Sequence, residues 1–384
     1  MKNKNTRGIY LHIPFCVRKC HYCDFLSAPA DEHTKGQYVN ALIREIKEAP
    51  AWLKEQGSQT FAFSTAFFGG GTPSILKAEE IVRILTAIRE NFGFTADAEI
   101  TMEVNPGTLT EEKARIWHEA GVNRISFGLQ SADDEELKRI GRIHTFAKFQ
   151  ESFRIAREAG FDNINVDLMS ALPGQSMESY EETVRKVLEM KPEHISSYSL
   201  ILEEGTYLYD HLKEFPELPD EDMERAMYHR TCEMLKQAGF IHYEISNFSL
   251  PGRECRHNQS YWDRTEYLGV GLGSATLIGN KRFTGISSLK EYLKADKDDF
   301  RECQETLDTK DEMSEYMFLG LRMMKGVSLR AFEDLFGMSV MEVFSESVDK
   351  HIKDGTLKLS EGSLSLTERG IDVANFVMSD FLVD

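Results

Sequence analysis

Short apolar runs alternate with longer amphipathic segments over roughly the first two-thirds of the chain. A short apolar run is typical of a buried strand, and a longer segment with apolar positions three or four residues apart is typical of a helix. The pattern predicts strands at Ile9–Ile13, Thr65–Gly69, Glu99–Val104, Arg124–Leu129, Asn163–Met169 and His194–Leu200. The helices predicted between them include Gln37–Glu48, Ala78–Asn91, Glu111–Ala120 and Tyr180–Glu189. This alternation indicates an α/β fold with parallel strands and crossover helices.

Six such units favour an incomplete (βα)6 barrel over a closed eight-stranded one, and an open doubly wound sheet is the alternative. Polar residues stand near the carboxyl ends of four predicted strands: Glu103, Gln130, Asp167 and Ser199. In a parallel barrel that edge carries the chemistry, because the loops after the strands converge there. We therefore expect the functional site at this edge.

The pattern changes in the last third of the chain. From about residue 246 the pattern differs, and Asn247–Thr284 contains many glycines and aromatic residues and few helical signals. Beyond them the sequence predicts helices and a final hairpin with Gly362 at its turn, at Met313–Met324, Leu329–Phe336, Val340–Asp354 and Leu357–Thr367. We therefore expect a barrel domain over 1–245, a connecting region over 246–304, and a C-terminal helical, winged-helix-like domain over 305–384.

Composition and charge narrow the class of partner. Of 384 residues, 41% are hydrophobic and 28% are charged, as in an ordinary globular protein. The net charge of −18 repels nucleic acid and anionic lipid, so we expect no nucleic-acid partner. The apolar stretch after the basic start is too short for a signal peptide, and no window approaches the roughly 20 apolar residues of a membrane helix. We expect a cytoplasmic protein whose cysteines stay reduced.

The sharpest chemical signal is a group of three cysteines, Cys16, Cys20 and Cys23, directly after the first predicted strand. Cysteine thiolates are the usual ligands of iron–sulfur clusters, and three of them leave one iron of a [4Fe–4S] cluster with an open position. A zinc site is the alternative, but zinc calls for a fourth ligand at finger-like spacing. His21 lies inside the loop and Cys232 is far away, so we expect the cluster.

The spacing C-x3-C-x2-C, with Tyr22 before the last cysteine, resembles the signature of the radical S-adenosylmethionine (SAM) superfamily. The resemblance implies that SAM chelates the open iron and that an electron from the cluster cleaves its sulfonium. Three glycines, Gly69 to Gly71, follow the second predicted strand and let the backbone approach a ligand closely. In this context they resemble the superfamily motif that holds the SAM amino group.

The resemblance becomes specific when the motifs are taken together across essentially the whole chain. Tyr10–Cys16, Phe68–Pro73, Glu103–Pro106, Ser126–Gln130, Gly141–His144 and Asp167–Gly174 resemble the oxygen-independent coproporphyrinogen III oxidase (HemN-like) family. The resemblance implies SAM contacts from Tyr10, Tyr22 (facing the adenine), Gly70, Gly71, Thr72, Glu103, Gln130, Arg142 and Asp167.

Three features depart from the authentic oxidases. Phe25 stands where the oxidases carry a fourth cysteine, and only 15 residues precede Cys16, where the oxidases have a long extension. Third, residues 257–262, HNQSYW, match the HNxxYW motif of the HemW heme-chaperone branch of the family. All three features resemble that branch more than the oxidases.

Residues 251–262 also suit heme on chemical grounds. Histidine is a common axial ligand, aromatic rings pack on a macrocycle, and guanidinium groups suit carboxylates. We expect His257 in a flexible loop, with Cys255 as an alternative ligand and Arg253 and Arg256 pairing with propionates. The alternative is that His257 has only a structural role, packed among aromatic residues of the core. Together with the resemblance, this implies heme contact from His257, Asn258, Tyr261 and Trp262.

The implied function is that of a heme chaperone, which binds heme and transfers it to an acceptor apoprotein while carrying a SAM-ligated [4Fe–4S] cluster. Coproporphyrinogen III oxidation by radical decarboxylation, or another heme-directed radical SAM reaction, is the alternative. A flavodoxin or ferredoxin is a reasonable electron donor, and a membrane-associated acceptor is compatible with a soluble chain. The sequence leaves open the acceptor, SAM turnover and a homodimer.

Overall fold

The structure is a computed structural model that describes residues 7–58 and 61–382, without the side chains of residues 298 and 302–304. Its first six strands are parallel and lie next to one another in chain order. They are β1 (Arg7–Ile13), β2 (Phe63–Gly70), β3 (Phe94–Val104), β4 (Arg124–Gln130), β5 (Ile164–Ser170) and β6 (His194–Ser199). The six strands expected from the sequence are thus confirmed, with β3 beginning earlier, at Phe94.

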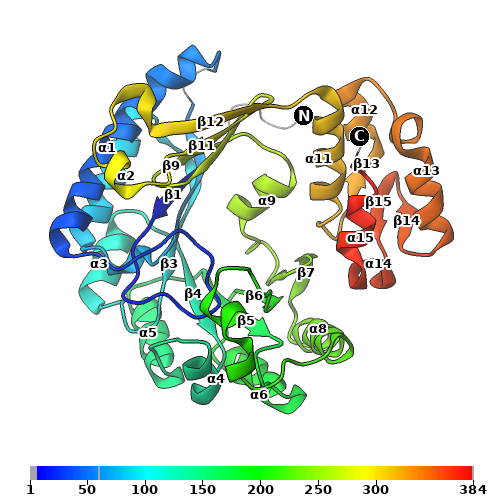
Figure 1. The fold of residues 1–384 in the computed structure, drawn as a ribbon, viewed down its shortest axis with the longest axis horizontal. Coiled ribbons are helices and arrows are strands. Elements are labelled where there is room, and N and C mark those ends of the chain that lie inside the picture. The colour runs from blue at the N-terminus through cyan, green and yellow to red at the C-terminus, as the bar shows by residue number, and fades with distance from the viewer. Residues whose placement is uncertain (1–6, 59–60, 383–384) are drawn as a thin grey trace.

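Helices connect these strands on the outer side of a sheet that curves into an open arc (Figure 1). They are α1 (Glu32–Glu55), α2 (Ala78–Asn91), α3 (Glu111–Glu119), α4 (Asp134–Arg139), α5 (Phe146–Glu158) and α6 (Met177–Glu189), followed by α7 (Tyr207–Asp210) and α8 (Glu221–Gln237). A doubly wound sheet would reverse its strand order and carry helices on both faces. The observed order is that of an incomplete (βα)6 barrel, as predicted.

Residues 241–306 extend this sheet at both edges. Beyond β6 lie β8 (Asn247–Ser249) and β7 (Ile241–Glu244), both antiparallel. Next to β1 lies the parallel strand β9 (Tyr267–Val270). Three antiparallel strands follow it: β10 (Ala275–Ile278), β11 (Lys281–Gly285) and β12 (Arg301–Thr306). The connecting region of the sequence analysis therefore lies largely in the sheet, and its expected boundaries stay a prediction.

The short helix α9 (Arg256–Trp262) lies on the concave side of the arc (Figure 1) and contacts β1 and β2. The alternation of side chains along β1 shows how the two faces differ. Ile9, Leu11 and Ile13 are fully buried in the core, whereas Tyr10 and His12 point to the opposite, concave face. The concave face therefore carries the polar side chains.

The C-terminal domain has its own core and a three-stranded sheet in the order β13-β15-β14. Its elements are α11 (Thr309–Gly320), β13 (Val327–Ser328), α12 (Leu329–Phe336), α13 (Val340–Lys353), β14 (Leu357–Ser360), β15 (Ser363–Leu366), α14 (Glu368–Asp372) and α15 (Ala374–Ser379). The expected hairpin is confirmed: Glu361 and Gly362 form its two-residue turn at φ 51° and 77°. The arrangement is the winged-helix-like one that the sequence predicts.

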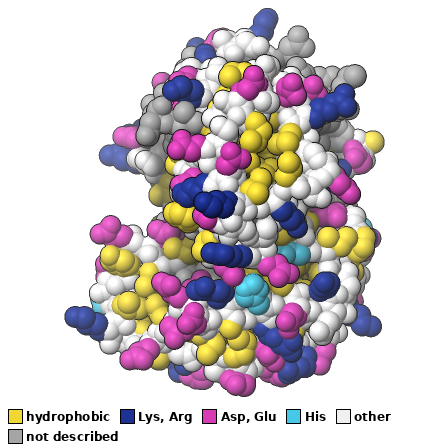
Figure 2. All heavy atoms as spheres, turned by 90° about the vertical axis from the view of Figure 1, so that its right-hand side faces the viewer, with side chains coloured by type: hydrophobic (Ala, Val, Ile, Leu, Met, Phe, Trp, Pro, Cys, Tyr) yellow, Lys and Arg dark blue, Asp and Glu magenta, His cyan; other side chains and the backbone are white. Residues whose placement is uncertain are grey.

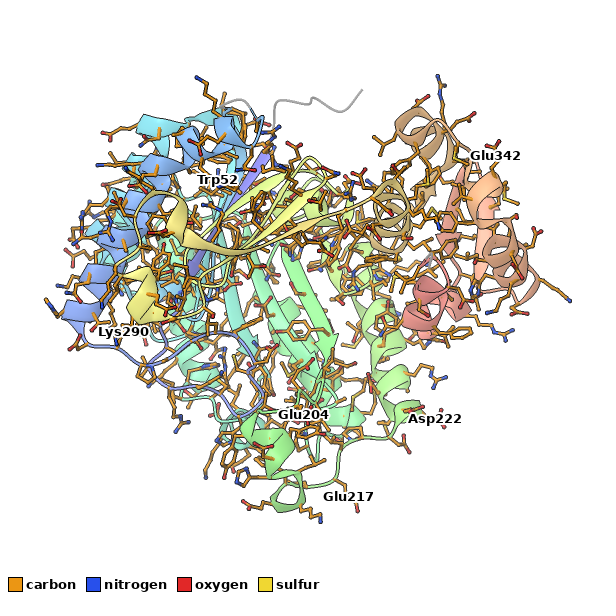
Figure 3. The ribbon with its side chains drawn as sticks, turned by 45° about the horizontal axis from the view of Figure 1, so that its top comes forward. Trp52, Glu204, Glu217, Asp222, Lys290 and Glu342 are labelled. Carbon is orange, nitrogen blue, oxygen red and sulfur yellow. The ribbon has the colours of Figure 1, made fainter. Side chains whose placement is uncertain are left out.

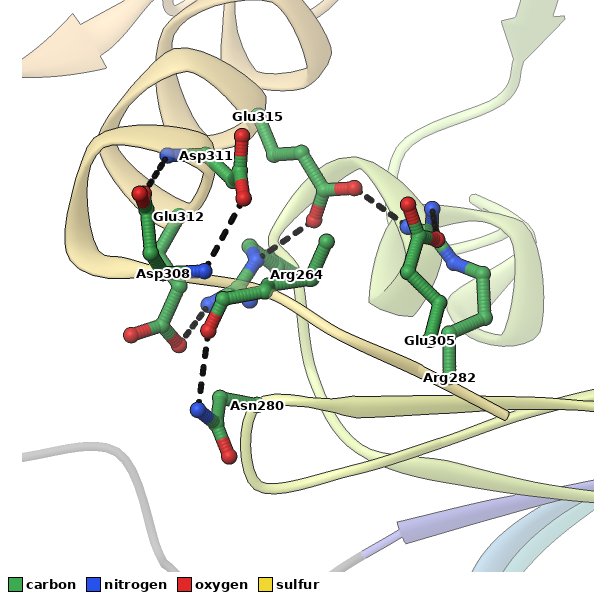
Figure 4. Close-up of polar contacts among 9 residues, drawn as sticks. Arg264, Asn280, Arg282, Glu305, Asp308, Asp311, Glu312 and Glu315 are labelled. Carbon is green, nitrogen blue, oxygen red and sulfur yellow. Dashed lines mark hydrogen bonds and ion pairs between the residues drawn. The ribbon is translucent and has the colours of Figure 1, made fainter.

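Ion pairs hold this domain to both edges of the arc. Arg264, just after α9, bonds Glu312 through Nη1 at 2.9 Å and Glu315 through Nε at 2.8 Å, and Arg282 also pairs with Glu315 (Figure 4). At the other edge, Glu244 pairs with Arg322 at 2.7 Å. The Arg264 and Glu315 side chains are each only 8% exposed.

On the face shown in Figure 2, lysine and arginine side chains are interspersed with aspartate and glutamate. The absence of a nucleic-acid partner stays a prediction. Over residues 7–58 and 61–382, no helix has both the length and the apolar character needed to cross a membrane. The expectation that the basic start of the chain is not part of a signal peptide involves the first six residues, which lie outside the described residues.

Candidate radical SAM and heme site

The loop after β1 carries all three predicted cluster ligands. A hydrogen bond from Cys16 N to Ala28 O, at 3.2 Å, closes the loop, and the three thiols are half-buried. The Cys16 thiol lies 3.4 Å from the Thr72 hydroxyl, and Arg142 Nη1 donates to Cys20 Sγ at 3.6 Å. The structure thus places the cysteines beside two of the predicted SAM residues.

These residues fit a cluster with an open iron. Burial, with a smaller contribution from the neighbouring Cys20 and Cys16, raises the pKa of the Cys23 thiol to about 11. An iron bound there would favour the thiolates. Within the described part of the chain, no three side chains among His, Cys, Asp and Glu converge tightly enough to hold a single metal ion. A [4Fe–4S] cluster instead spreads its ligands over separate irons.

The glycines after β2 run directly against the cysteine loop. Gly71 N donates to Ile13 O at 2.9 Å, and Thr72 N donates to Phe15 O at 2.8 Å. A Cβ on Gly71 would come within 2.7 Å of Phe15 O, so only glycine allows this approach. Gly70 has a positive φ of 103°, which glycine adopts without strain. The strap formed by residues 70–72 therefore fixes the cysteine loop to the sheet.

Two predicted carboxylates are half-buried: Glu103 stands next to the carboxyl end of β3, and Asp167 lies in the middle of β5. Burial raises the pKa of Glu103 to about 8, and the charge of Asp167 adds to the rise. Burial also raises the pKa of Asp167, against the donors Asn165 and Ser196. A cationic ligand such as SAM would favour the ionised form of both.

Arg142 lies between the cysteine loop and the sheet edge. Besides Cys20, its Nη2 donates to Asn105 Oδ1 at 3.2 Å and to Gly128 O. Burial lowers the pKa of Arg142, but Tyr22 and Cys20 outweigh this effect, so the pKa is raised above its usual value. Its Nε is buried and has no partner among the described residues, which leaves a donor for a ligand acceptor.

Sequence reasoning missed two residues that hold this edge together. Asn105 Nδ2 donates to Thr72 Oγ1 at 2.7 Å, so Asn105 bridges the strap to Arg142. Tyr198 donates to Gln130 Oε1 at 3.1 Å and fixes the amide of a residue whose φ is 76°. Asn105 stands inside the Glu103–Pro106 motif, which could have pointed to it. Tyr198 gave no signal beyond its place in a strand.

The loop after β6 closes the same end of the sheet, where Figure 3 labels Glu204 and Glu217. Leu208 N donates to His21 O at 2.8 Å, and the rings of His21 and Tyr207 lie 4.6 Å apart. The cysteine loop is therefore supported from two sides, by the residue 70–72 strap and by α7.

Comparison with known proteins matches the chain over its full length. Residues 10–187 match the Radical SAM superfamily, and residues 307–373 match the HemN C-terminal domain. The chain is 38% identical to heme chaperone HemW of Lactococcus lactis subsp. lactis, over 99% of this chain and 98% of the relative. It is 36% identical to HemW of Bacillus subtilis, over 98% of this chain and 99% of the relative.

The chain belongs to the HemW family of heme chaperones. It is therefore a radical SAM protein, which carries a [4Fe–4S] cluster with SAM. Among solved structures, coproporphyrinogen III oxidase (HemN) from Escherichia coli has a TM-score of 0.84 and 24% identity, covering 100% of this chain and 91% of that one. That likeness confirms the fold.

In this HemW-family chain the HNxxYW motif forms α9, so the expected flexible loop is wrong. His257 is 1% exposed, and both ring nitrogens are bonded: Nδ1 to Thr65 Oγ1 at 2.8 Å and Nε2 to the Tyr261 hydroxyl at 2.9 Å. Burial lowers its pKa to about 3. The Glu99 carboxylate accepts the N–H groups of Arg256 and His257, each at 3.0 Å, and so stabilises the start of a helix that local sequence did not predict.

The neighbouring candidates are also engaged. Burial raises the pKa of the Cys255 thiol to about 12, which keeps it protonated at neutral pH. Arg253 pairs with Asp162 at 3.1 Å, and Arg256 pairs with Asp97 at 2.9 Å. The pairing of these arginines with heme propionates therefore stays a prediction. It requires each arginine to exchange its aspartate for a propionate.

An aromatic stack joins α9 to Tyr10, one of the predicted SAM residues on β1. The Tyr10 and Phe67 rings are stacked at 6.4 Å, and the Phe67 and His257 rings are stacked at 5.1 Å. Tyr10 also contacts His12 Nδ1 through its hydroxyl at 3.1 Å. The HemW motif and the predicted SAM residues therefore share one wall of the arc.

Proposed function

We propose that this chain is a heme chaperone that binds heme and transfers it to an acceptor apoprotein. The proposal is supported by relatives named as heme chaperones that align over nearly the whole chain. Cys16, Cys20 and Cys23 would hold the cluster, and SAM would take the open iron. When bound, the pair supplies one-electron chemistry at the sulfonium.

The SAM contacts are assigned to the carboxyl edge of the sheet. The residue 70–72 strap presents backbone groups, Glu103 and Asp167 offer carboxylates, and the unpartnered Arg142 Nε offers a donor. Around them stand the remaining residues of the proposed site: Tyr10, Tyr22 and Gln130.

Heme is assigned to the concave side, in contact with His257, Asn258, Tyr261 and Trp262 of α9. The observation that supports this assignment is the ring stack from Tyr10 through Phe67 to His257, which links the motif to a proposed SAM residue. Iron ligation by His257 would replace its Thr65 or Tyr261 hydrogen bond. The chaperone would act in the cytoplasm, as a monomer or homodimer, with a flavodoxin or ferredoxin as reductant. Its acceptor can be membrane-associated.

The test of heme binding is a titration of ferric heme into the cluster-loaded protein, followed by absorbance. We expect His257→Ala to weaken binding by about tenfold or more, because a ligand and a stacked ring are lost. His351→Ala is the matched control, since His351 is also buried and bonded through both nitrogens, to Thr356 and Asp380. Equal heme affinity in the two variants would remove His257 from the site.

The oxidase alternative is tested in an anaerobic assay with SAM, reductant and coproporphyrinogen III. Phe25, which replaces the fourth cysteine, is 58% exposed beside the cysteine loop. We expect the tetrapyrrole mass to stay unchanged while SAM cleavage is measured in the same tube. Loss of two carboxyl groups would make the chain an oxidase.

A further inference from the structure

A chain of buried side chains runs from Asp167 to the start of α9. Asn165 Nδ2 lies 2.7 Å from Asp167 Oδ1, and Asn165 Oδ1 lies 2.6 Å from His194 Nδ1. His194 Nε2 is 2.8 Å from the Tyr243 hydroxyl, which is 3.2 Å from Cys255 N. Asn165, His194, Tyr243 and Cys255 are all at most 8% exposed. The predicted SAM carboxylate and the HemW motif are thus joined by continuous hydrogen bonding.

Every donor in this series of hydrogen bonds points toward Asp167. Cys255 N–H can only donate, so the Tyr243 oxygen accepts and its O–H donates onward to His194 Nε2. A neutral imidazole that accepts at Nε2 donates from Nδ1, and Asn165 Oδ1 can only accept. Asn165 then donates to Asp167. Hydrogen bonds aligned in this way polarise one another, so a change at the carboxylate is felt along the chain.

The last bond in the chain matters for the placement of α9. Cys255 stands at the N-cap position of α9 and provides no side-chain cap. The first N–H groups are held from outside the helix, Cys255 N by Tyr243 and the next two by Glu99. The position of α9, and with it His257, therefore depends on these two partners.

We propose that Asn165, His194 and Tyr243 are positioning residues that couple SAM binding at Asp167 to heme binding at α9. The inference rests on the proposed function and adds its regulation. A SAM hydroxyl that donates to Asp167 competes with Asn165 for the carboxylate, and the altered bond is passed through His194 and Tyr243 to Cys255. Because coupling between two binding equilibria is reciprocal, heme changes SAM affinity by the same factor.

The test compares heme dissociation constants of the cluster-loaded protein with and without SAM, with no reductant present so that SAM stays intact. The wild-type ratio is expected to be about 5 or more. Tyr243→Phe removes the hydroxyl from the middle of the chain, keeps the ring and is expected to bring the ratio to about 1. His194→Phe removes the hydrogen bonds of His194 to Asn165 and Tyr243, and it is also expected to bring the ratio to about 1.

Tyr180→Phe is the matched control. Its hydroxyl is buried and contacts Ser197 at 2.6 Å and Thr231 at 3.1 Å, away from the chain, so the wild-type ratio should remain. Iron content and the thermal midpoint are measured for each variant. The reciprocal measurement, SAM affinity with and without heme, must change by the same factor.

Three outcomes overturn the coupling while heme binding stands: a wild-type ratio of 1, a wild-type ratio retained in Tyr243→Phe, or a ratio lost equally in Tyr180→Phe. A wild-type protein that takes up no heme would instead overturn the proposed function itself, and the coupling with it.

Discussion

Glu103 shares the concave edge of the sheet with Asp167, and burial favours the neutral form of both carboxyl groups. The pKa of Glu103 is about 8 in the folded chain against an ordinary 4.5, so the folded state holds its proton more tightly than the unfolded state does. The resulting stabilisation is fully present below about pH 4.5 and is lost as the pH rises through about 8. Without a cationic ligand, Glu103 therefore weakens the fold at alkaline pH.

Glu103→Gln, which mimics the protonated acid, should remove this dependence. We expect the free energy of unfolding of the variant, relative to that of the wild type, to rise by up to about 4 kcal/mol between pH 5 and pH 9 in the SAM-free protein. Urea unfolding at the two pH values measures it. A stability difference that is the same at both would show that the pKa of Glu103 is not raised by folding.

Single elements depend on close backbone contacts, and the residue 70–72 strap is the clearest case. A Cβ on Gly71 would meet the carbonyl oxygens of Phe15 and Ile13, so Gly71→Ala must displace the cysteine loop. We expect the iron content after reconstitution to fall several-fold, because the loop that carries the three cysteines is displaced from the sheet. The measurement is iron per chain together with cluster absorbance.

The matched control is Gly36→Ala inside α1, where the nearest atom to an added Cβ is Glu80 Oε1 at 3.9 Å. That substitution should leave the iron content unchanged and stabilise the fold by about 0.5–1 kcal/mol, since alanine favours a helix. A Gly71→Ala protein that assembles its cluster as the wild type does would contradict the role of the strap.

The whole molecule is held together where the C-terminal domain meets the arc. Arg264 pairs with Glu312 and Glu315 on α11, and Arg264→Ala would leave Glu312 without this cation (Figure 4). We expect the free energy of unfolding to fall by about 1–3 kcal/mol, because the Arg264 and Glu315 side chains are largely buried. Urea unfolding and limited proteolysis of residues 307–382 would detect it.

Arg330→Ala is the control for that experiment. Its side chain is 91% exposed, its partner Asp334 lies 3.9 Å away, and such pairs contribute little. If both variants unfold alike, the junction does not depend on the Arg264 ion pairs.

At the level of the whole fold, the periodic patterns predicted those features that depend on residues close together in the sequence. The six parallel strands and the final hairpin follow from local periodicity and turn residues, and the three cysteines are close in sequence as well as in space. The resemblance of the motifs to known families predicted the family. The strands β9 to β11 were missed because they are too short to show the alternation that marks a half-buried strand, and β12 was missed because its residues are mostly polar.

The sequence by itself determined the parallel barrel, the cysteine loop and the family, because each rests on short-range patterns or motifs. Only the tertiary structure decided that the HNxxYW segment is a buried helix. Its N–H groups are held by Glu99, 158 positions away from His257, and its imidazole is bonded to Thr65, 192 positions away. Contacts over such separations leave no periodic trace in the sequence, since each partner is a single residue whose role depends on how the sheet curves.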